Sequence, residues 1–354
     1  MSDTSTTSSV GGGGPGAHMR QEMAEQPAVL ARLLQRRDEV ASLVQDVVGG
    51  SLDGVALLAR GSSDNVAVHA RYLLEAATGR PVGLVAPSLH THYGVQVDYT
   101  GRLVVAISQS GATPEITAVL TRLREAGART LAVTNDPASP LAQAAHGVVE
   151  LGAGSEVAVP ATKTVAAQFA ALLLVARALA PARVPFSDTD LDSLPGAAAD
   201  VLADAAVADA VAGRLAASRT VVAVARGYLF PAALESALKI RESAGIPAEG
   251  WSAADLRHGP IAALDAATAV LAYAVPGPTA TDVDDLVAAL RTRGLDPVRV
   301  GLGAPAGGLT LPPVAEALAA IPAVIRGQQL ALATALCRGI DPDAPLGLSK
   351  ITVT

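Results

Sequence analysis

Short runs of apolar residues alternate with longer amphipathic stretches along most of this 354-residue chain. Residues 55–59, 103–107 and 130–134 are runs of strand length with almost no charged or amide side chains. Such runs are typical of parallel strands that are buried on both faces of a sheet. Because longer helical stretches separate them, the pattern predicts an α/β fold with right-handed βαβ crossovers and helices on both faces.

The same strand–turn–helix pattern occurs twice. Leu58-Ala-Arg-Gly61 follows the first strand, and Val224-Ala-Arg-Gly227 follows another strand 166 residues later. The sequence therefore predicts two related units, over residues 50–185 and 217–338, joined by a helical connector over residues 186–216. We expect a helix over residues 19–49 before them and a catalytic tail over residues 339–354 after them. Residues 1–18 are rich in Ser, Thr and Gly and are expected to form a disordered tail.

Composition excludes several classes of function. Only 3% of the residues are aromatic and the net charge is −7, which disfavours a nucleic-acid or anionic-membrane partner. No continuous apolar run reaches the roughly 18 residues of a membrane span, and the start lacks a signal-peptide pattern, so we predict a cytoplasmic protein. A single cysteine, Cys337, excludes an internal disulfide and is expected to be buried on a helix. The pair His90 and His92 has no evident partner carboxylate, so we expect no metal and no cofactor.

The run Ser108-Gln-Ser-Gly-Ala-Thr-Pro-Glu115 follows a predicted strand directly. Thr113 fits the N-cap of the next helix and Pro114 its first position, so hydroxyls and backbone N–H groups would meet at a positive helix end. This arrangement predicts a phosphate site. A second hydroxyl-rich turn, Gly61-Ser-Ser-Asp64, would reach the same edge of the sheet, although an ordinary capped turn has the same composition. Without a lysine or a nucleotide P-loop motif, the two loops suit a phosphomonoester.

Only three residues are lysines, and the other 23 basic residues are arginines, which cannot lose a proton as lysine can. Lys239 lies three residues before Glu242 on a predicted helix, so the two would share a face; a buried Glu242 could act as a base. Glu235 could pair with Lys239, either at the site or as a solvated ion pair. Lys350, on the tail, could form an imine or polarise a carbonyl. Lys163 is expected in a buried ion pair, with Glu156 as the candidate partner.

These motifs resemble the SIS (sugar isomerase) family from about residue 19 to residue 354. Within the family, the chain resembles the isomerase half of glucosamine-6-phosphate synthase. It resembles SIS-type glucosamine-6-phosphate deaminases more closely. The matching segments are Met19-Arg-Gln-Glu-Met-Ala-Glu-Gln-Pro27, Ser108-Gln-Ser-Gly-Ala-Thr113, Ala161-Thr-Lys163, Ala233-Leu-Glu-Ser-Ala-Leu-Lys239, Glu242, Leu256-Arg-His-Gly-Pro260 and the segment from Asp341 to Thr354.

The resemblance implies two flavodoxin-like α/β/α domains with mainly parallel sheets, and a role for each matched residue. Glu242 would move a proton between C2 and C1, and His258 of a neighbouring subunit in a homodimer would open the sugar ring. Lys350 would stand at the reacting carbon with Lys239 beside it. Contacts to the sugar phosphate would come from Gly61, Ser63, Ser108, Gln109, Ser110, Thr113 and Val159.

Two residues depart from the family pattern, because Ala112 replaces a frequent Glu and Ala161 replaces a Ser. Release of ammonia from glutamine would need a cysteine nucleophile early in the chain. No cysteine precedes Cys337, so that reaction is not expected. We therefore predict deamination of glucosamine 6-phosphate to fructose 6-phosphate and ammonia. Two alternatives stay open. One is a lyase acting on N-acetylglucosamine 6-phosphate, favoured by the hydroxyl missing at Ala161, and the other is a non-catalytic sugar-phosphate sensor.

Overall fold

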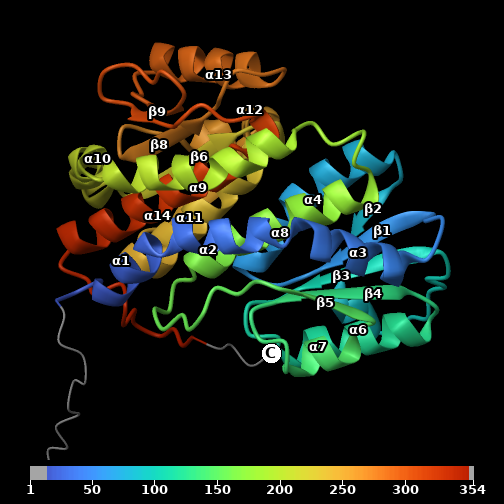
Figure 1. Cartoon of the computed structure of the whole chain (residues 1–354). Coiled ribbons are helices and arrows are strands. Elements are labelled where there is room, and N and C mark those ends of the chain that lie inside the picture. Colours follow the sequence, from blue (N-terminus) through green and yellow to red (C-terminus); the bar gives the residue numbers. More distant parts are fainter. Residues whose placement is uncertain (1–13, 351–354) are drawn as a thin grey trace, which may run out of the picture.

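Two parallel five-stranded sheets form the framework of the protein (Figure 1). The computed structural model describes residues 14–350, so what was predicted for residues 1–13 and 351–354 lies outside the described residues. The strand orders are β2-β1-β3-β4-β5 and β10-β9-β8-β6-β7. Both are the flavodoxin-like 2-1-3-4-5 order when each unit is counted from its own first strand, which confirms the predicted fold class.

The three strands predicted over residues 55–59, 103–107 and 130–134 begin and end within one residue of those bounds. The first sheet contains β1 Gly54–Leu58, β2 Val82–Leu84, β3 Arg102–Ile107, β4 Arg129–Thr134 and β5 Gly147–Glu150. The second sheet contains β6 Thr220–Ala225, β7 Ala248–Ser252, β8 Thr268–Tyr273, β9 Val298–Gly301 and β10 Leu309–Thr310.

Helices cover both faces of each sheet. The helices before and within the first unit are α1 Ala17–Ala24, α2 Gln26–Gln35, α3 Arg37–Val48, α4 Ser62–Thr78, α5 Pro87–Thr91, α6 Pro114–Glu125, α7 Pro140–Ala144 and α8 Lys163–Leu179. The helices that follow are α9 Asp188–Ala203, α10 Ala206–Ala217, α11 Phe230–Ala244, α12 Ala253–Arg257, α13 Ala280–Thr292 and α14 Ala320–Cys337, with short 3-10 turns η1 Gly227–Leu229, η2 Pro260–Ala263 and η3 Glu316–Leu318.

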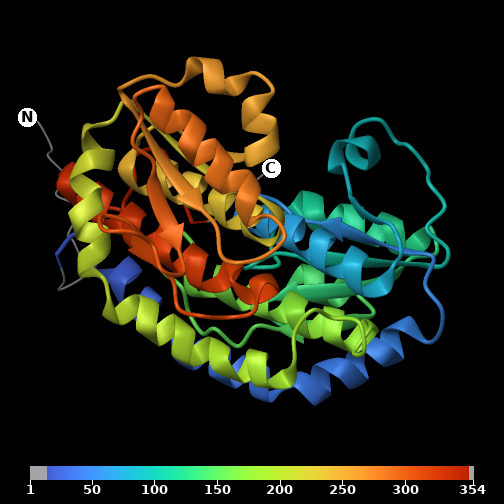
Figure 2. The ribbon, with the colours of Figure 1, turned by 90° about the horizontal axis from the view of Figure 1, so that it is seen from above.

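Alternate residues of the central strands β1, β3, β4, β6 and β8 enter different cores, as the two-residue period of a strand requires. In β1, Val55 and Leu57 pack in a core shared by both units, whereas Ala56 and Leu58 pack against α6 in a separate core. The shared core holds α4, α8, α11 and α14 between the two sheets, and α11 packs along α14. On the outside, α9 runs beside α2 (Figure 2). The two units therefore form one packed body.

One stretch of the described residues, Glu316–Cys337, is long and apolar enough by length and composition to cross a membrane. Within the protein, 89% of its apolar window is buried, as in the core helix of a globular domain. At its end Cys337 is exposed, so the prediction of a buried cysteine was wrong. The cysteine is on a helix, as predicted, but it is the last residue of that helix.

The segment before the first strand is three helices, where the sequence suggested one. The first break falls at Glu25, just before Pro27, whose ring and missing N–H interrupt a helix. The second falls at Arg36, where no proline or glycine marks it in the sequence. Helix α1 already begins at Ala17, and Gly16 N donates to Asp341, so residues 16–18, which were expected in the disordered tail, pack on the protein.

The crossing of α11 and α14 predicts how two glycines respond to substitution. A Cβ atom on Gly327 in α14 would stand 2.1 Å from Ser236 Oγ, whereas a Cβ atom on Gly213 in α10 would meet nothing within 4 Å. Gly327→Ala should therefore lower the free energy of unfolding by about 1–3 kcal/mol through overpacking. Gly213→Ala is the matched control and should raise that free energy by about 0.5–1 kcal/mol. Denaturant unfolding of both variants checks this, and equal effects would contradict the described crossing.

Candidate active site

A pocket of about 380 Å³ lies at the carboxyl edge of the first sheet, between β1 and β3. This is the switch point of a doubly wound sheet, where loops diverge and ligands bind. Helix α11 of the second unit and the C-terminal tail close the other side. The lining residues are Arg60, Gly61, Ser62, Ser63, Ser108, Gln109, Ser110, Thr113, Val159, Ala161, Thr164, Val165, Gln168, Lys239, Glu242, Leu348, Ser349 and Lys350.

The loop after β3 forms an anion cradle at the N-terminus of α6. Gly111 has φ +60°, and a Cβ there would stand 2.1 Å from Ser139 Oγ, so the turn needs glycine. Ser108 Oγ accepts a hydrogen bond from Gly111 N at 3.2 Å, and Ser110 Oγ accepts one from Ala112 N at 3.2 Å. Thr113 is the N-cap, although its side chain makes no capping bond. Its hydroxyl is therefore not committed to the helix and lines the pocket.

Arg60 adds a positive charge to this pocket from the loop after β1. Its guanidinium forms an ion pair with Glu115, in the first turn of α6, at 2.9 Å. The pair ties the two loops of the pocket together. Ser63, on α4, donates to Gln168 Oε1 at 3.1 Å and is nearly buried. Contacts from several elements thus hold the loops after β1 and β3 in place.

On α11, Lys239 lies between two carboxylates. Its ammonium contacts Glu242 at hydrogen-bond distance and Glu235 at 3.6 Å. Burial would lower the pKa of Lys239, but the charges of Glu242 and Glu235 outweigh it and raise that pKa. Burial also raises the pKa of Glu235, which accepts from Asn65 at 2.8 Å. The pairing is therefore internal rather than solvated, and Glu242 is the partner that reaches the pocket.

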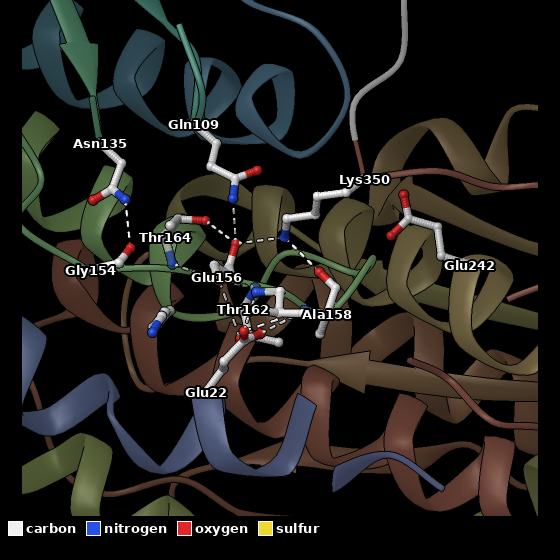
Figure 3. A network of polar contacts seen from close by, with 12 residues as sticks. Glu22, Gln109, Asn135, Gly154, Glu156, Ala158, Thr162, Thr164, Glu242 and Lys350 are labelled. Atoms are coloured by element: carbon white, nitrogen blue, oxygen red, sulfur yellow. Dashed lines mark hydrogen bonds and ion pairs between the residues drawn. The ribbon is translucent and has the colours of Figure 1, made fainter. Parts of the chain in front are cut away.

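Beside the pocket, Glu156 accepts hydrogen bonds from several lining residues (Figure 3). One carboxylate oxygen, Oε2, accepts from Gln109 Nε2 at 2.9 Å, Thr164 Oγ1 at 2.6 Å and Lys350 Nζ at 3.1 Å. The other accepts from the backbone N–H groups of Thr162 and Thr164. Burial would raise the pKa of Glu156, but Lys350 and these hydrogen bonds outweigh it and hold the pKa below its usual value. A fully buried carboxylate is thereby kept ionised.

Lysine pairing differs from the sequence prediction in one respect. Lys163 begins α8, is buried and forms the expected ion pair, but its partner is Glu25 at 2.5 Å. Glu156 pairs instead with Lys350. The partners differ because neighbouring residues point in different directions. Thr162 and Thr164 contact Glu156, whereas Lys163, between them, points toward the N-terminal helices.

Ten of the eleven predicted site residues line this one pocket, and His258 does not. His258 is the exposed C-cap of α12. Sequence reasoning missed Arg60, Gln168 and the role of Glu156. Arg60 could have been found, since it stands in the turn after a strand next to Ser63. Glu156 gave no such signal, because its donors come from three separate segments of the chain.

The described residues also form other hollows, but no metal-binding group. A larger hollow of about 770 Å³ lies beside His90, Arg122 and the loop 94–98, at the C-terminal end of α6, where the helix offers no free N–H groups. Among residues 14–350, no group of three or more His, Cys, Asp or Glu side chains could hold a metal ion.

The second unit carries the same turns 166 residues later but not their polar groups. Ser108, Gln109 and Ser110 correspond to Ala274, Val275 and Pro276, at the end of β8. Glu316 covers this turn, since a Cβ on Gly277 would stand 2.4 Å from its Oε2. Thr279, which corresponds to Thr113, donates to Glu316 Oε1 at 3.3 Å. A carboxylate thus occupies the edge where the first unit has its cradle.

Comparisons with known proteins agree with this architecture. The model of the SIS domain matches residues 53–178 and 214–301. Glutamine–fructose-6-phosphate aminotransferase (isomerizing) from Bacillus cereus is 32% identical over 345 residues, covering 94% of this chain and 57% of that protein. The enzyme of that name from Mycobacterium tuberculosis is 33% identical over 365 residues, covering 96% and 58%. This chain therefore spans a little over half the length of these relatives.

Solved structures show the same fold. A protein assigned as a phosphosugar isomerase from Silicibacter pomeroyi DSS-3 is 30% identical, with a TM-score of 0.80 over 92% of this chain and 99% of that chain. A glucosamine-6-phosphate deaminase from Thermotoga maritima is 22% identical, with a TM-score of 0.79 over 96% of this chain and 100% of that chain.

The contrast between the two cradles predicts one anion site per chain. Titration with inorganic phosphate, followed by calorimetry, should saturate at one phosphate per chain. Thr113→Val should weaken binding about tenfold or more, the effect of losing a hydrogen bond to a charged group. Thr279→Val is the matched control at the equivalent position and should bind as the unaltered protein does. Two phosphates per chain, or equal effects of the two variants, would contradict the assignment.

Proposed function

This chain is a phosphosugar-isomerase-type member of the SIS domain family, and we propose that it deaminates glucosamine 6-phosphate to fructose 6-phosphate and ammonia. One observation carries the proposal: an anion cradle, a lysine-held carboxylate and a tail lysine line the same pocket. The cradle with Arg60 would hold the phosphate. The sugar would then extend toward Glu242 and Lys350.

Glu242 is the proposed base. Its contact with Lys239 keeps the carboxylate pointed at the pocket, and about a quarter of its side chain is exposed there. In the open-chain sugar, Glu242 would remove the proton at C2 and return it to C1. The C2 amine then becomes an imine, which water hydrolyses to the ketone with release of ammonia. Lys350 would act at the reacting carbon, either through an imine of its own or by polarising the carbonyl.

Several features favour free ammonia as the nitrogen product. The one cysteine of the chain, Cys337, is exposed at the end of α14 and does not line the pocket. The pocket therefore offers no thiol for releasing ammonia from glutamine. The relative from Thermotoga maritima bears the name glucosamine-6-phosphate deaminase and shares the whole fold. We expect the reaction to take place in the cytoplasm.

A lyase reaction on N-acetylglucosamine 6-phosphate is the second candidate. Ala161 lines the pocket, where the family pattern has a serine, so the sugar-facing wall is less polar and slightly wider. An acylated C2 nitrogen cannot form the hydrolysable imine, and loss of the C2 proton could then expel the C3 hydroxyl. Glu242 would serve as the base in both reactions.

Incubation with both sugar phosphates separates the two candidates. Glucosamine 6-phosphate should yield ammonia and fructose 6-phosphate in equal amounts, while the N-acetyl sugar yields no unsaturated product. Glu242→Gln should bind the sugar phosphate and turn over about 10²- to 10⁴-fold more slowly, as expected for the loss of a general base. Glu249→Gln, on the exposed side of β7, is the control and should be fully active. Absence of ammonia from the unaltered protein would refute deamination.

We further propose that the active form is a homodimer in which His258 enters the site of the other subunit. The residue is exposed at the end of α12 and absent from the pocket of its own chain, which supports this assignment. An imidazole suits proton transfer to the ring oxygen near neutral pH.

Mixed dimers test the sharing of His258. His258→Asn and Glu242→Gln should each be inactive alone, but together they should regain part of the activity. In a mixed dimer one site keeps both the intact Glu242 and the partner's intact histidine. Coexpression of the two variants with different tags, followed by purification of the mixed dimer, gives the measurement. Mixed dimers as inactive as the single variants would rule out sharing.

A further inference from the structure

We propose that Asp343 and Glu156 are positioning residues for Lys350. Asp343 anchors the C-terminal tail on the N-terminus of α1, and Glu156 sets the place of the lysine ammonium in the pocket. This inference rests on the proposed function, which gives Lys350 its place at the reacting carbon. We call Asp343, Glu22 and Glu156 together the tail clamp.

Asp343 binds the first free N–H groups of α1. Its Oδ2 accepts from His18 N and its Oδ1 from Met19 N, both at 2.8 Å. The N-cap of α1 is Gly16, which has no side chain to bind these groups. Asp343, 324 residues after Met19, therefore supplies the acceptors that an N-cap side chain would normally provide. The helix dipole also favours its negative charge at this end of the helix.

The same helix holds the loop against which Lys350 lies. The carboxylate of Glu22, buried on α1, accepts from the backbone N–H groups of Val157 and Ala158. The carbonyl oxygen of Ala158 in turn accepts from Lys350 Nζ at 2.5 Å. Helix α1 thus fixes the tail at Asp343 and also fixes one of the two acceptors of its lysine.

Glu156 is the second acceptor, and its position is closely defined. Its side chain is fully buried, and the loop 156–164 and Gln109 supply its other donors. Because Gln109 is part of the anion cradle, Glu156 links the place of the ammonium to the place of the phosphate. The two ends of a bound sugar phosphate would therefore meet groups held at a fixed separation.

The anchor shortens the tether of Lys350. Between Asp343 and Lys350 the chain can span at most about 25 Å, against about 32 Å if the tether began at Asp341, which accepts from Gly16 N. Local concentration falls with the 3/2 power of tether length, about 1.5-fold here. Loss of an N-cap acceptor weakens such an attachment by a further factor of roughly two to twenty. We therefore expect an effect between about threefold and thirtyfold on docking of the tail.

Competitive acetylation of the three lysines measures docking without any substrate. The acetylated fraction at each lysine is read by mass spectrometry, with buried Lys239 as the internal reference. In Asp343→Ala and in Glu156→Gln, acetylation of Lys350 should rise about threefold to thirtyfold relative to Lys239. Glu25→Gln is the matched control, because Glu25 also pairs with a lysine but outside the pocket, and it should leave Lys350 unchanged.

Turnover provides the second measurement, with whichever sugar phosphate the unaltered protein converts. Asp343→Ala should lower kcat while KM stays within about threefold. Because kcat follows the docked fraction of the tail and acetylation follows the undocked fraction, the fold loss of kcat multiplied by the fold rise in Lys350 acetylation should equal the weakening of docking. Asp343 does not line the pocket, so such a split would reflect the position of Lys350. Glu25→Gln should turn over as the unaltered protein does.

Two results would overturn the tail clamp. They are a uniform rise in acetylation at all three lysines of folded Asp343→Ala, and a product of the Lys350 acetylation rise and the kcat loss that stays below about twofold. If Glu156→Gln does not fold, Glu156→Asp, which keeps the charge but shortens the reach, should still raise acetylation of Lys350 at least threefold. Because acetylation needs no substrate, failure of the deaminase proposal would leave this test intact and separately readable.

Discussion

Buried charge is the constraint on which this pocket depends. Glu156 and Glu235 have fully buried side chains, and Lys239 is nearly so. Leaving one such charge without a partner would cost several kcal/mol. Lys239 is paired within its own helix, α11, but Glu235 also accepts from Asn65 on α4. Glu156 accepts from Gln109 and from Lys350. These longer-range contacts bring the first unit, α11 and the C-terminal tail to one place.

The two units have the same strand order but different side chains at the switch point of the sheet. In both, the loops after the first and third strands meet at the switch point of the sheet. In the first unit these loops keep hydroxyls and Arg60 in front of the N-terminus of α6. In the second unit, apolar residues, Pro276 and the carboxylate of Glu316 stand at the matching place. The second unit contributes through its helix α11 instead, which carries Lys239 and Glu242 to the pocket of the first.

Local signals in the sequence predicted what depends on short segments. The runs around β1, β3 and β4 and the loop from Ser108 to Thr113 were all recognisable, because buried parallel strands and helix N-termini have distinct compositions. The pairing of Glu156 with Lys350 and the anchoring of Asp343 on α1 were not, since they join residues more than 100 positions apart. The break of the N-terminal helix at Arg36 was also not predicted, because no proline or glycine lies at that position.

The central claim is that one sugar phosphate spans from the cradle at α6 to the lysine and carboxylate of the opposite wall. A crystal structure with fructose 6-phosphate bound tests it most directly. The account predicts the phosphate at the backbone N–H groups and hydroxyls of Ser108 to Thr113, with C1 and C2 between Glu242 and Lys350. A phosphate bound at the edge of the second sheet, or C2 out of reach of both Glu242 and Lys350, would contradict it.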